Sequence, residues 1–137
     1  MTQYQQMIFT NLAVSDLEAS KKFFSELGYT LNAQFSDETC ASFVVSEHIV
    51  IMLLTKEKYA SFTKKAIIDS HSNSEVLLCL SAESREKVDE LVGKALAAGG
   101  TESGEKQDYG FMYGRAFDDL DGHTFEIMWM DPSAIES

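Results

Sequence analysis

The feature that most constrains the fold is an internal repeat. The sequence predicts a strand, a helix and three further strands, and then the same order again about 66 to 71 residues later. A repeat of this kind indicates two βαβββ modules in one chain. The predicted strands cover 7–14, 29–35, 40–45 and 49–54 in the first half, and 75–80, 101–106, 110–118 and 124–130 in the second.

Two amphipathic helices separate the first two strands of each half. Ser15 and Glu18 form a capping-box pattern that predicts a helix over 16–27, ended by Gly28. A second helix is predicted over 84–98, and a short one within 57–65. The apolar faces that should pack against the sheets are Leu17, Phe23, Phe24 and Leu27 in the first long helix, and Val88, Leu91, Val92, Ala95 and Leu96 in the second.

The last predicted strand carries the most informative carboxylate. An acidic turn over 118–122 precedes it, and side chains alternate between faces along a strand, so Phe125, Ile127 and Trp129 share one face. Glu126 then lies among methionines on the other face, where a charge is costly unless it is paired or ligated. The alternative, a Glu126 simply solvated on a half-exposed strand, stays open at this point.

Composition excludes several classes. A chain of 137 residues with 45% hydrophobic content can build a core, and its net charge of −11 argues against nucleic acid and should attract cations. No signal peptide or membrane-length apolar run is visible, so we expect a cytoplasmic protein without a membrane partner. Cys40 and Cys79 lack Cys-x-x-Cys spacing, and each is expected to be a buried or half-buried thiol.

Two segments carry a family resemblance. The opening run 9–17, followed by Phe23-Phe24 and Leu27-Gly28-Tyr29, and the closing run 108–129, resemble the vicinal oxygen chelate superfamily of glyoxalase I, bleomycin-resistance proteins and extradiol dioxygenases. The resemblance covers nearly the whole chain. It implies an α+β fold, a single domain over 1–137 in which two βαβββ modules form curved mixed sheets around a concave pocket, with the helices on the outer faces. The modules would span about 7–54 and 75–131, joined by a connector over 55–74.

Metal-dependent members of the superfamily use four strand positions to bind one divalent ion. Carried over, these positions are Phe9, Met52, Glu75 and Glu126, so only two hard donors remain. The three histidines lie in predicted turns or loops and do not repair the set. We therefore expect no tightly held cofactor, although weak binding of a divalent ion by Glu75 and Glu126 stays open.

A ligand pocket follows from strand alternation and the resemblance. Tyr113 or Met112 is expected beside it, and a Met-rich face can equally be core that fills its own space. The residues assigned to ligand binding are Phe9, Asn11, Met52, Glu75, Leu77, Cys79, Tyr113 and Met128, with Glu126 as the candidate catalytic group.

Two functions compete. The first is a metal-free protein that binds a small organic ligand, as bleomycin-resistance members bind a cationic aromatic drug at a dimer interface. The second is a glyoxalase-like lyase or isomerase in which Glu126 and Glu75 act at a metal, with Arg115 as the only evident group for the glutathione carboxylates. Under either, the resemblance implies a homodimer, because one module surrounds only part of a pocket.

Overall fold

The structure is a computed structural model that describes residues 3–134. The chain forms two compact units, Met1–Ile68 and Asp69–Ser137. The division falls within the predicted connector. Each unit holds one mixed sheet with one long helix, so the α+β class and the two-module repeat are confirmed. Between residues 3 and 134, none of the helices has the length and apolarity needed to cross a membrane.

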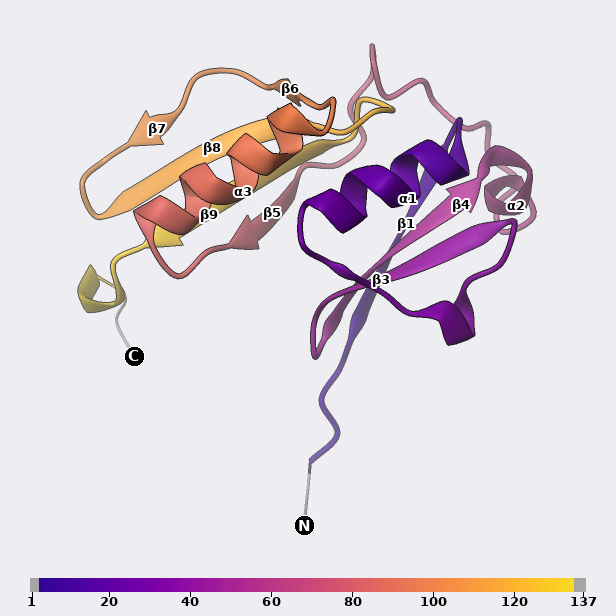
Figure 1. Ribbon diagram of the computed structural model, residues 1–137, viewed down its shortest axis with the longest axis horizontal. Coiled ribbons are helices and arrows are strands. Elements are labelled where there is room, and N and C mark those ends of the chain that lie inside the picture. The colour runs from indigo at the N-terminus through magenta and orange to yellow at the C-terminus, as the bar shows by residue number, and fades with distance from the viewer. Residues whose placement is uncertain (1–2, 135–137) are drawn as a thin grey trace. The chain divides into compact units, whose positions relative to one another are not determined.

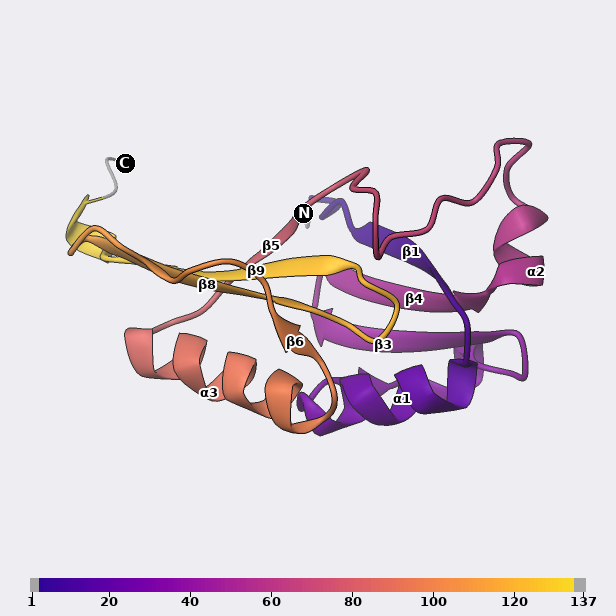
Figure 2. The same cartoon turned by 90° about the horizontal axis from the view of Figure 1, so that it is seen from above.

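The first unit is a four-stranded sheet with the strand order β1-β4-β3-β2, in which β1 runs parallel to β4 and the other pairs are antiparallel. The long helix α1 lies along one face of this sheet, as Figures 1 and 2 show. The elements are β1 (Ile8–Val14), α1 (Leu17–Glu26), β2 (Thr30–Leu31), the 3-10 helix η1 (Ala33–Phe35), β3 (Cys40–Ser46), β4 (Ile49–Thr55) and the short helix α2 (Lys56–Ala60).

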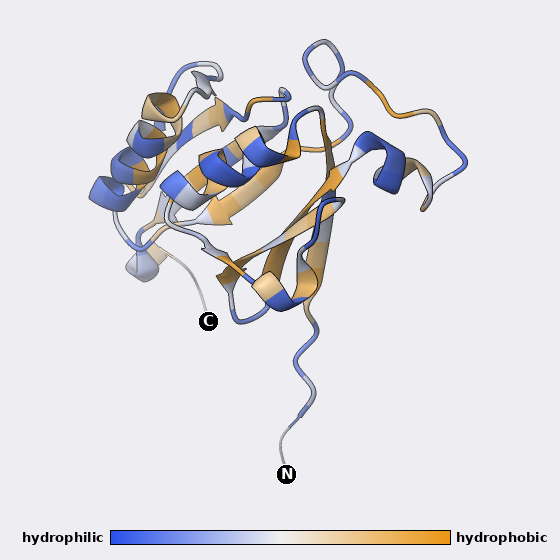
Figure 3. Ribbon diagram, turned by 45° about the vertical axis from the view of Figure 1, so that its right-hand side comes forward, coloured by the Kyte–Doolittle hydropathy of each residue, from blue (hydrophilic) through white to orange (hydrophobic). Residues whose placement is uncertain are grey.

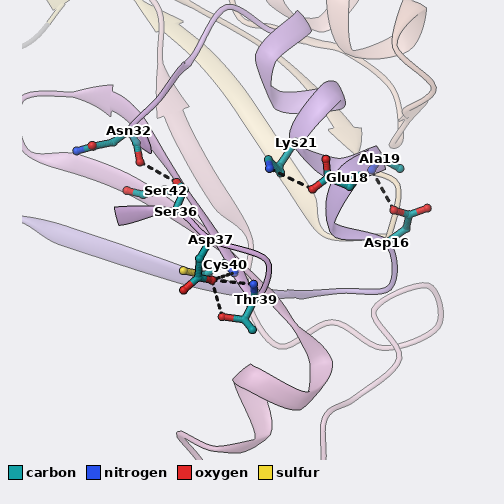
Figure 4. Close-up of polar contacts among 10 residues, drawn as sticks. All are labelled: Asp16, Glu18, Ala19, Lys21, Asn32, Ser36, Asp37, Thr39, Cys40 and Ser42. Atoms are coloured by element: carbon teal, nitrogen blue, oxygen red, sulfur yellow. Dashed lines mark hydrogen bonds and ion pairs between the residues drawn. The ribbon is translucent and has the colours of Figure 1, made fainter. Parts of the chain in front are cut away.

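Two local predictions in this unit need correction. The N-cap of α1 is Asp16, whose carboxylate accepts the Ala19 N–H at 3.1 Å, and the predicted capping-box residue Glu18 instead pairs with Lys21 at 3.1 Å (Figure 4). The predicted strand over 29–35 ends after two residues. The Asn32 side chain accepts the Gln34 N–H at 3.1 Å and starts a 3-10 turn there.

The core of the first unit lies between α1 and the sheet. Phe23 and Phe24 of α1 are 1% and 0% exposed, and Phe43 on β3 is 0% exposed. The rings of Phe23 and Phe24 meet edge to face at a centroid distance of 5.1 Å, and Phe24 lies 6.0 Å from Phe43. The predicted packing face of α1 is therefore confirmed. Ile8 at the start of β1 is 57% exposed, and the buried part of that strand begins at Leu12.

The second unit has the strand order β5-β9-β8-β6, with β7 also pairing β8. Strand β5 runs parallel to β9, and β9 is antiparallel to β8. Helix α3 covers one face of this sheet (Figure 2). The elements are β5 (Leu78–Ser81), α3 (Arg85–Ala97), β6 (Thr101–Glu102), β7 (Gln107–Asp108), β8 (Met112–Asp118), β9 (Thr124–Met130) and the 3-10 helix η2 (Pro132–Ala134).

Strand β5 starts at Leu78, three residues later than predicted. Leu78 pairs with Phe125 on β9, and β9 itself begins at Thr124. Residues 75 and 76 would therefore lie opposite the turn that precedes β9, where no strand exists to pair them. Val76, which lies outside the strand, is accordingly 55% exposed.

The core of the second unit also lies between its long helix and its sheet. Val88 and Val92 of α3 are fully buried, as are Phe125 and Ile127 on β9, and Phe117 stacks on Phe125 at a centroid distance of 5.4 Å. The colouring in Figure 3 shows the same division, with hydrophobic strands and a largely hydrophilic outer side on α3. The predicted helix face is confirmed for Val88, Val92 and Ala95, whereas Leu91 and Leu96 are only half-buried.

Candidate functional site

Glu126 lies near the middle of β9, on the face of the second sheet that points away from α3. We call this the helix-free face of the second unit. Glu126 pairs in register with Cys79 on β5 and with Ala116 on β8, so these three side chains form one row across the sheet. The next row contains Ser81, Met128 and Gly114. The sheet therefore brings together Cys79, Glu126 and Met128 of the predicted site.

The turn before β9 fixes the position of this row. The Asp119 carboxylate, which is 6% exposed as a residue, accepts the backbone N–H of Asp121 at 3.0 Å and of His123 at 2.9 Å. The His123 Nδ1 lies 2.8 Å from the same carboxylate. Gly122 has a φ of +89°, and a Cβ there would lie 2.7 Å from the His71 backbone nitrogen. His123 and His71 are thus parts of the turn and of the segment packed on it.

Glu126 has no ion pair or side-chain hydrogen bond to any residue between 3 and 134, although it is half-buried. Its neighbour Cys79 is exposed, not buried or half-buried as predicted, because among the described strands β5 is an edge strand that pairs with β9 alone. Partial burial, followed by the negative charge of Glu126, raises the pKa of the Cys79 thiol. Cys79 is therefore a protonated, weakly reactive thiol at neutral pH.

The first unit has an equivalent helix-free face, opposite α1. Asn11, Met52 and Ser42 form a row across β1, β4 and β3 that corresponds to the row of Cys79, Glu126 and Ala116. Asn11 is exposed and Met52 half-buried. Phe9, paired with Val50, lies one row away and is 54% exposed. The predicted residues Phe9, Asn11 and Met52 therefore do share one face.

At the edge of this face, hydrogen bonds hold Cys40 in place. The Asp37 carboxylate accepts the Thr39 N–H and hydroxyl, both at 2.7 Å, and the Cys40 N–H at 3.1 Å (Figure 4). These bonds, led by that of the Thr39 hydroxyl, lower the pKa of Asp37. The Cys40 thiol itself lies 3.5 Å from the Phe35 carbonyl oxygen. Cys40 is half-buried, as predicted.

The two predicted metal residues are not neighbours in the sheet. Cys79 is the partner of Glu126, and Glu75 is exposed four residues earlier, outside β5. Comparison of the two units shows why: Asn11 corresponds to Cys79, so Phe9 corresponds to Leu77 and not to Glu75. Within residues 3–134, no group of three or more His, Cys, Asp and Glu side chains is arranged to hold a metal ion.

Tyr113 lies on the other face of the second sheet, beneath α3, and so points away from Glu126. It is 5% exposed, and its hydroxyl donates to Asp89 of α3 at 2.7 Å. This hydrogen bond, with burial, raises the pKa of Tyr113. The Arg85 guanidinium carbon lies 4.5 Å from the Tyr113 ring centroid and 5.8 Å from that of Trp129. Both aromatic residues therefore already have a cationic partner.

Arg115 is part of the same network, which the sequence analysis missed. Its guanidinium donates to Asp89 at 3.0 Å and to Glu102 at 2.9 Å. The hydrogen bond from Tyr113 is the main cause of a lowered Asp89 pKa, and Arg115 adds to it. A shallow hollow of about 590 Å³ borders Arg115, lined by Asp89, Glu102, Gly104, Glu105, Lys106 and Arg115. Because both carboxylates neutralise it, Arg115 is poorly suited to bind the carboxylates of glutathione.

Comparisons with known proteins agree with the two-module fold. Residues 6–46 match a family described as bleomycin resistance protein-like N-terminal. A search of the curated proteins gives no match. The chain is similar to a hypothetical protein from S. aureus, with 29% identity over 93% of this chain and 95% of that one and a TM-score of 0.77.

Two further solved structures share the fold at lower identity. A glyoxalase-related enzyme from Fulvimarina pelagi is 23% identical over 92% of this chain and 88% of its own, with a TM-score of 0.77. A glyoxalase/bleomycin resistance protein/dioxygenase family enzyme from Burkholderia phytofirmans PsJN is 20% identical over 92% and 99%, with a TM-score of 0.74. At these identities the likeness concerns the fold.

Proposed function

We propose that this chain, which belongs to the vicinal oxygen chelate superfamily by its fold and its N-terminal match, is a binding protein for a small organic cation. The ligand would lie on the helix-free face of the second unit, with its charge on the Glu126 carboxylate. One observation carries the proposal: Glu126 is half-buried and has no partner between residues 3 and 134.

The charge balance supports a cationic ligand. A ligand that covered Glu126 would withdraw its carboxylate from water, which is costly unless an opposite charge or hydrogen-bond donors compensate it, and a cationic ligand would supply that compensation. The net charge of −11 would also raise the local concentration of cations near the protein. A neutral or anionic ligand would leave the cost at Glu126 in place.

The surroundings of Glu126 support an apolar body on that cation. Met128 lies in the adjacent row, and methionine side chains adapt to ligands of irregular shape. Ala116 and Gly114 on β8 are the register partners of Glu126 and Met128 on β9. Both are small, so they leave room for a ligand above β8. A carboxylate beside flexible apolar groups and small residues fits an amine carried by an aromatic or aliphatic skeleton.

The placement of Glu75 favours binding over metal-dependent catalysis. A lyase that used Glu75 and Glu126 at one ion would need both carboxylates at bonding distance, whereas the register puts Cys79 beside Glu126. Of the four positions that the two units show to be equivalent, Phe9, Met52, Leu77 and Glu126, only Glu126 provides a hard donor. The lyase is therefore the weaker proposal.

A titration with two matched ligands tests the proposal. 9-Aminoacridine is a planar cation at pH 7, and acridine is its largely uncharged counterpart. We expect the cation to bind more tightly, and Glu126→Gln to weaken its binding by about tenfold, or about 1.4 kcal/mol. The control is Glu86→Gln, which changes the net charge equally at an exposed position on α3. Equal effects of the two variants, or equal binding of the two ligands, would overturn it.

A further inference from the structure

Three methionines lie together on the helix-free face of the second unit. Met128 and Met130 are two residues apart on β9 and so point to the same side of the sheet. Met112 on β8 is the register partner of Met130. All three are half-buried, so their thioethers are neither sealed in the core nor fully in solvent.

The spacing allows the three sulfur atoms to approach one point. Directly opposed residues such as Met112 and Met130 have Cβ atoms about 5 Å apart, and the diagonal pair Met112 and Met128 is about 7 to 8 Å apart. A methionine side chain is long and unbranched enough to span half of such a distance. Gly114 lies opposite Met128, and a Cβ there would be 4.0 Å from the Met128 Cβ, so the absence of a side chain leaves space beside Met128.

From this arrangement we infer that Met112, Met128 and Met130 form a site for a soft monovalent metal ion, Cu(I). Thioethers are soft, uncharged donors that favour Cu(I) over hard divalent ions. Glu126 is on the same face two residues before Met128, and its negative charge favours the approach of a cation. Cys79 pairs with Glu126 and lies two rows from Met112 and Met130, so it is not one of the ligands.

The inference shares Met128 and the charge of Glu126 with the organic-cation site proposed above, but it depends on the three thioether sulfurs, which that proposal does not use. It also differs from the superfamily's divalent metal position. That position depends on hard donors, whereas this site depends on sulfur alone. The first unit offers a built-in comparison. Met52 is a half-buried methionine on its helix-free face, and its register partners are Asn11 and Ser42, neither of which is a methionine.

Methyl NMR with silver(I) tests the site directly. Silver(I) is a redox-stable ion of the same soft class, and the full chain would be labelled with 13C at the methionine methyls. Because thiols also bind silver, the experiment uses Cys40→Ser/Cys79→Ser in chloride-free buffer, with assignment by single Met→Leu variants. We expect the methyls of Met112, Met128 and Met130 to shift together and to saturate at one silver ion per chain. Those of Met7 and Met52 should not move.

If the cysteine variant does not fold, the wild-type chain serves instead, since its two thiols take the first two silver ions and the methionine methyls should respond at the third. Competition against a Cu(I) chelator should then show affinity lowered about tenfold by Met128→Leu and unchanged by Met52→Leu. Methyl shifts no larger at the three sites than at Met7 and Met52 would overturn the inference and leave an ordinary apolar surface. So would equal Cu(I) affinity in the two Leu variants.

Discussion

Replacement of Phe24 by alanine tests the packing of α1 on the first sheet. Phe24 is completely buried and contacts the rings of Phe23 at 5.1 Å and Phe43 at 6.0 Å. Buried Phe→Ala changes cost about 3 to 5 kcal/mol, and the loss of two ring contacts favours the upper part of that range. At a slope of about 2 kcal/mol per molar urea, a loss of about 4 kcal/mol lowers the unfolding midpoint by about 2 M.

The assay is urea unfolding followed by far-UV circular dichroism, with Phe62→Ala as control. Phe62 is 67% exposed, so its removal should change the free energy of unfolding by less than about 0.5 kcal/mol. Fluorescence of Trp129, the only tryptophan, reports the second unit in the same samples. A loss below about 1 kcal/mol for Phe24→Ala would refute the assigned helix face.

Three further predictions concern the turn, the polar network and assembly. Gly122→Ala should lower the free energy of unfolding by about 2 kcal/mol or more, and by more than Gly28→Ala. Both glycines have positive φ, but of the two only Gly122 is packed against backbone atoms, and equal losses of stability in thermal melts would contradict this. Asp89→Asn should lower stability at pH 7 by about 1 kcal/mol or less, because the pKa of Asp89 is lowered in the folded chain, and the difference from wild type should vanish as the pH falls through that lowered pKa. A difference that persists in strong acid would count against an ionic cause. Light scattering at micromolar concentration should give the mass of a homodimer, and a monomeric mass would remove the assembly that the family resemblance implies.

Much of the fold could be predicted because it depends on periodic patterns. The alternation in 124–130 identified β9 with its exact bounds, and the burial of Phe125 and Ile127 followed from it. The errors came where pairing depends on distant residues. The start of β5 depends on where β9 begins, and the 3-10 turn after β2 depends on one Asn32 side chain. Neither the start of β5 nor this 3-10 turn is marked by a periodic pattern of apolar residues in the sequence.

The candidate site was harder to predict because it depends on register. Alternation alone put Glu126 on the correct side of β9, but an error in the start of β5 assigned Glu75 the position that belongs to Leu77. Tyr113 was assigned to the ligand face, although it alternates with Met112 and lies beneath α3. The acidic residues on α3 and the single Arg115 on β8 were the sequence signal for the Asp89–Tyr113–Arg115 network. Only the fold shows that Asp89 is the helix residue that contacts Arg115.

Metal content of the purified chain tests the central claim most directly, because it decides whether Glu126 serves a bound cationic ligand or a catalytic ion. Catalytic zinc normally has three protein ligands, and the equivalent positions of the two units offer one hard donor. Elemental analysis after dialysis should therefore find zinc and nickel far below one ion per chain, in the wild type and in Glu126→Gln alike. About one zinc or nickel ion per chain in the wild type, lost in Glu126→Gln, would contradict the account and restore the lyase.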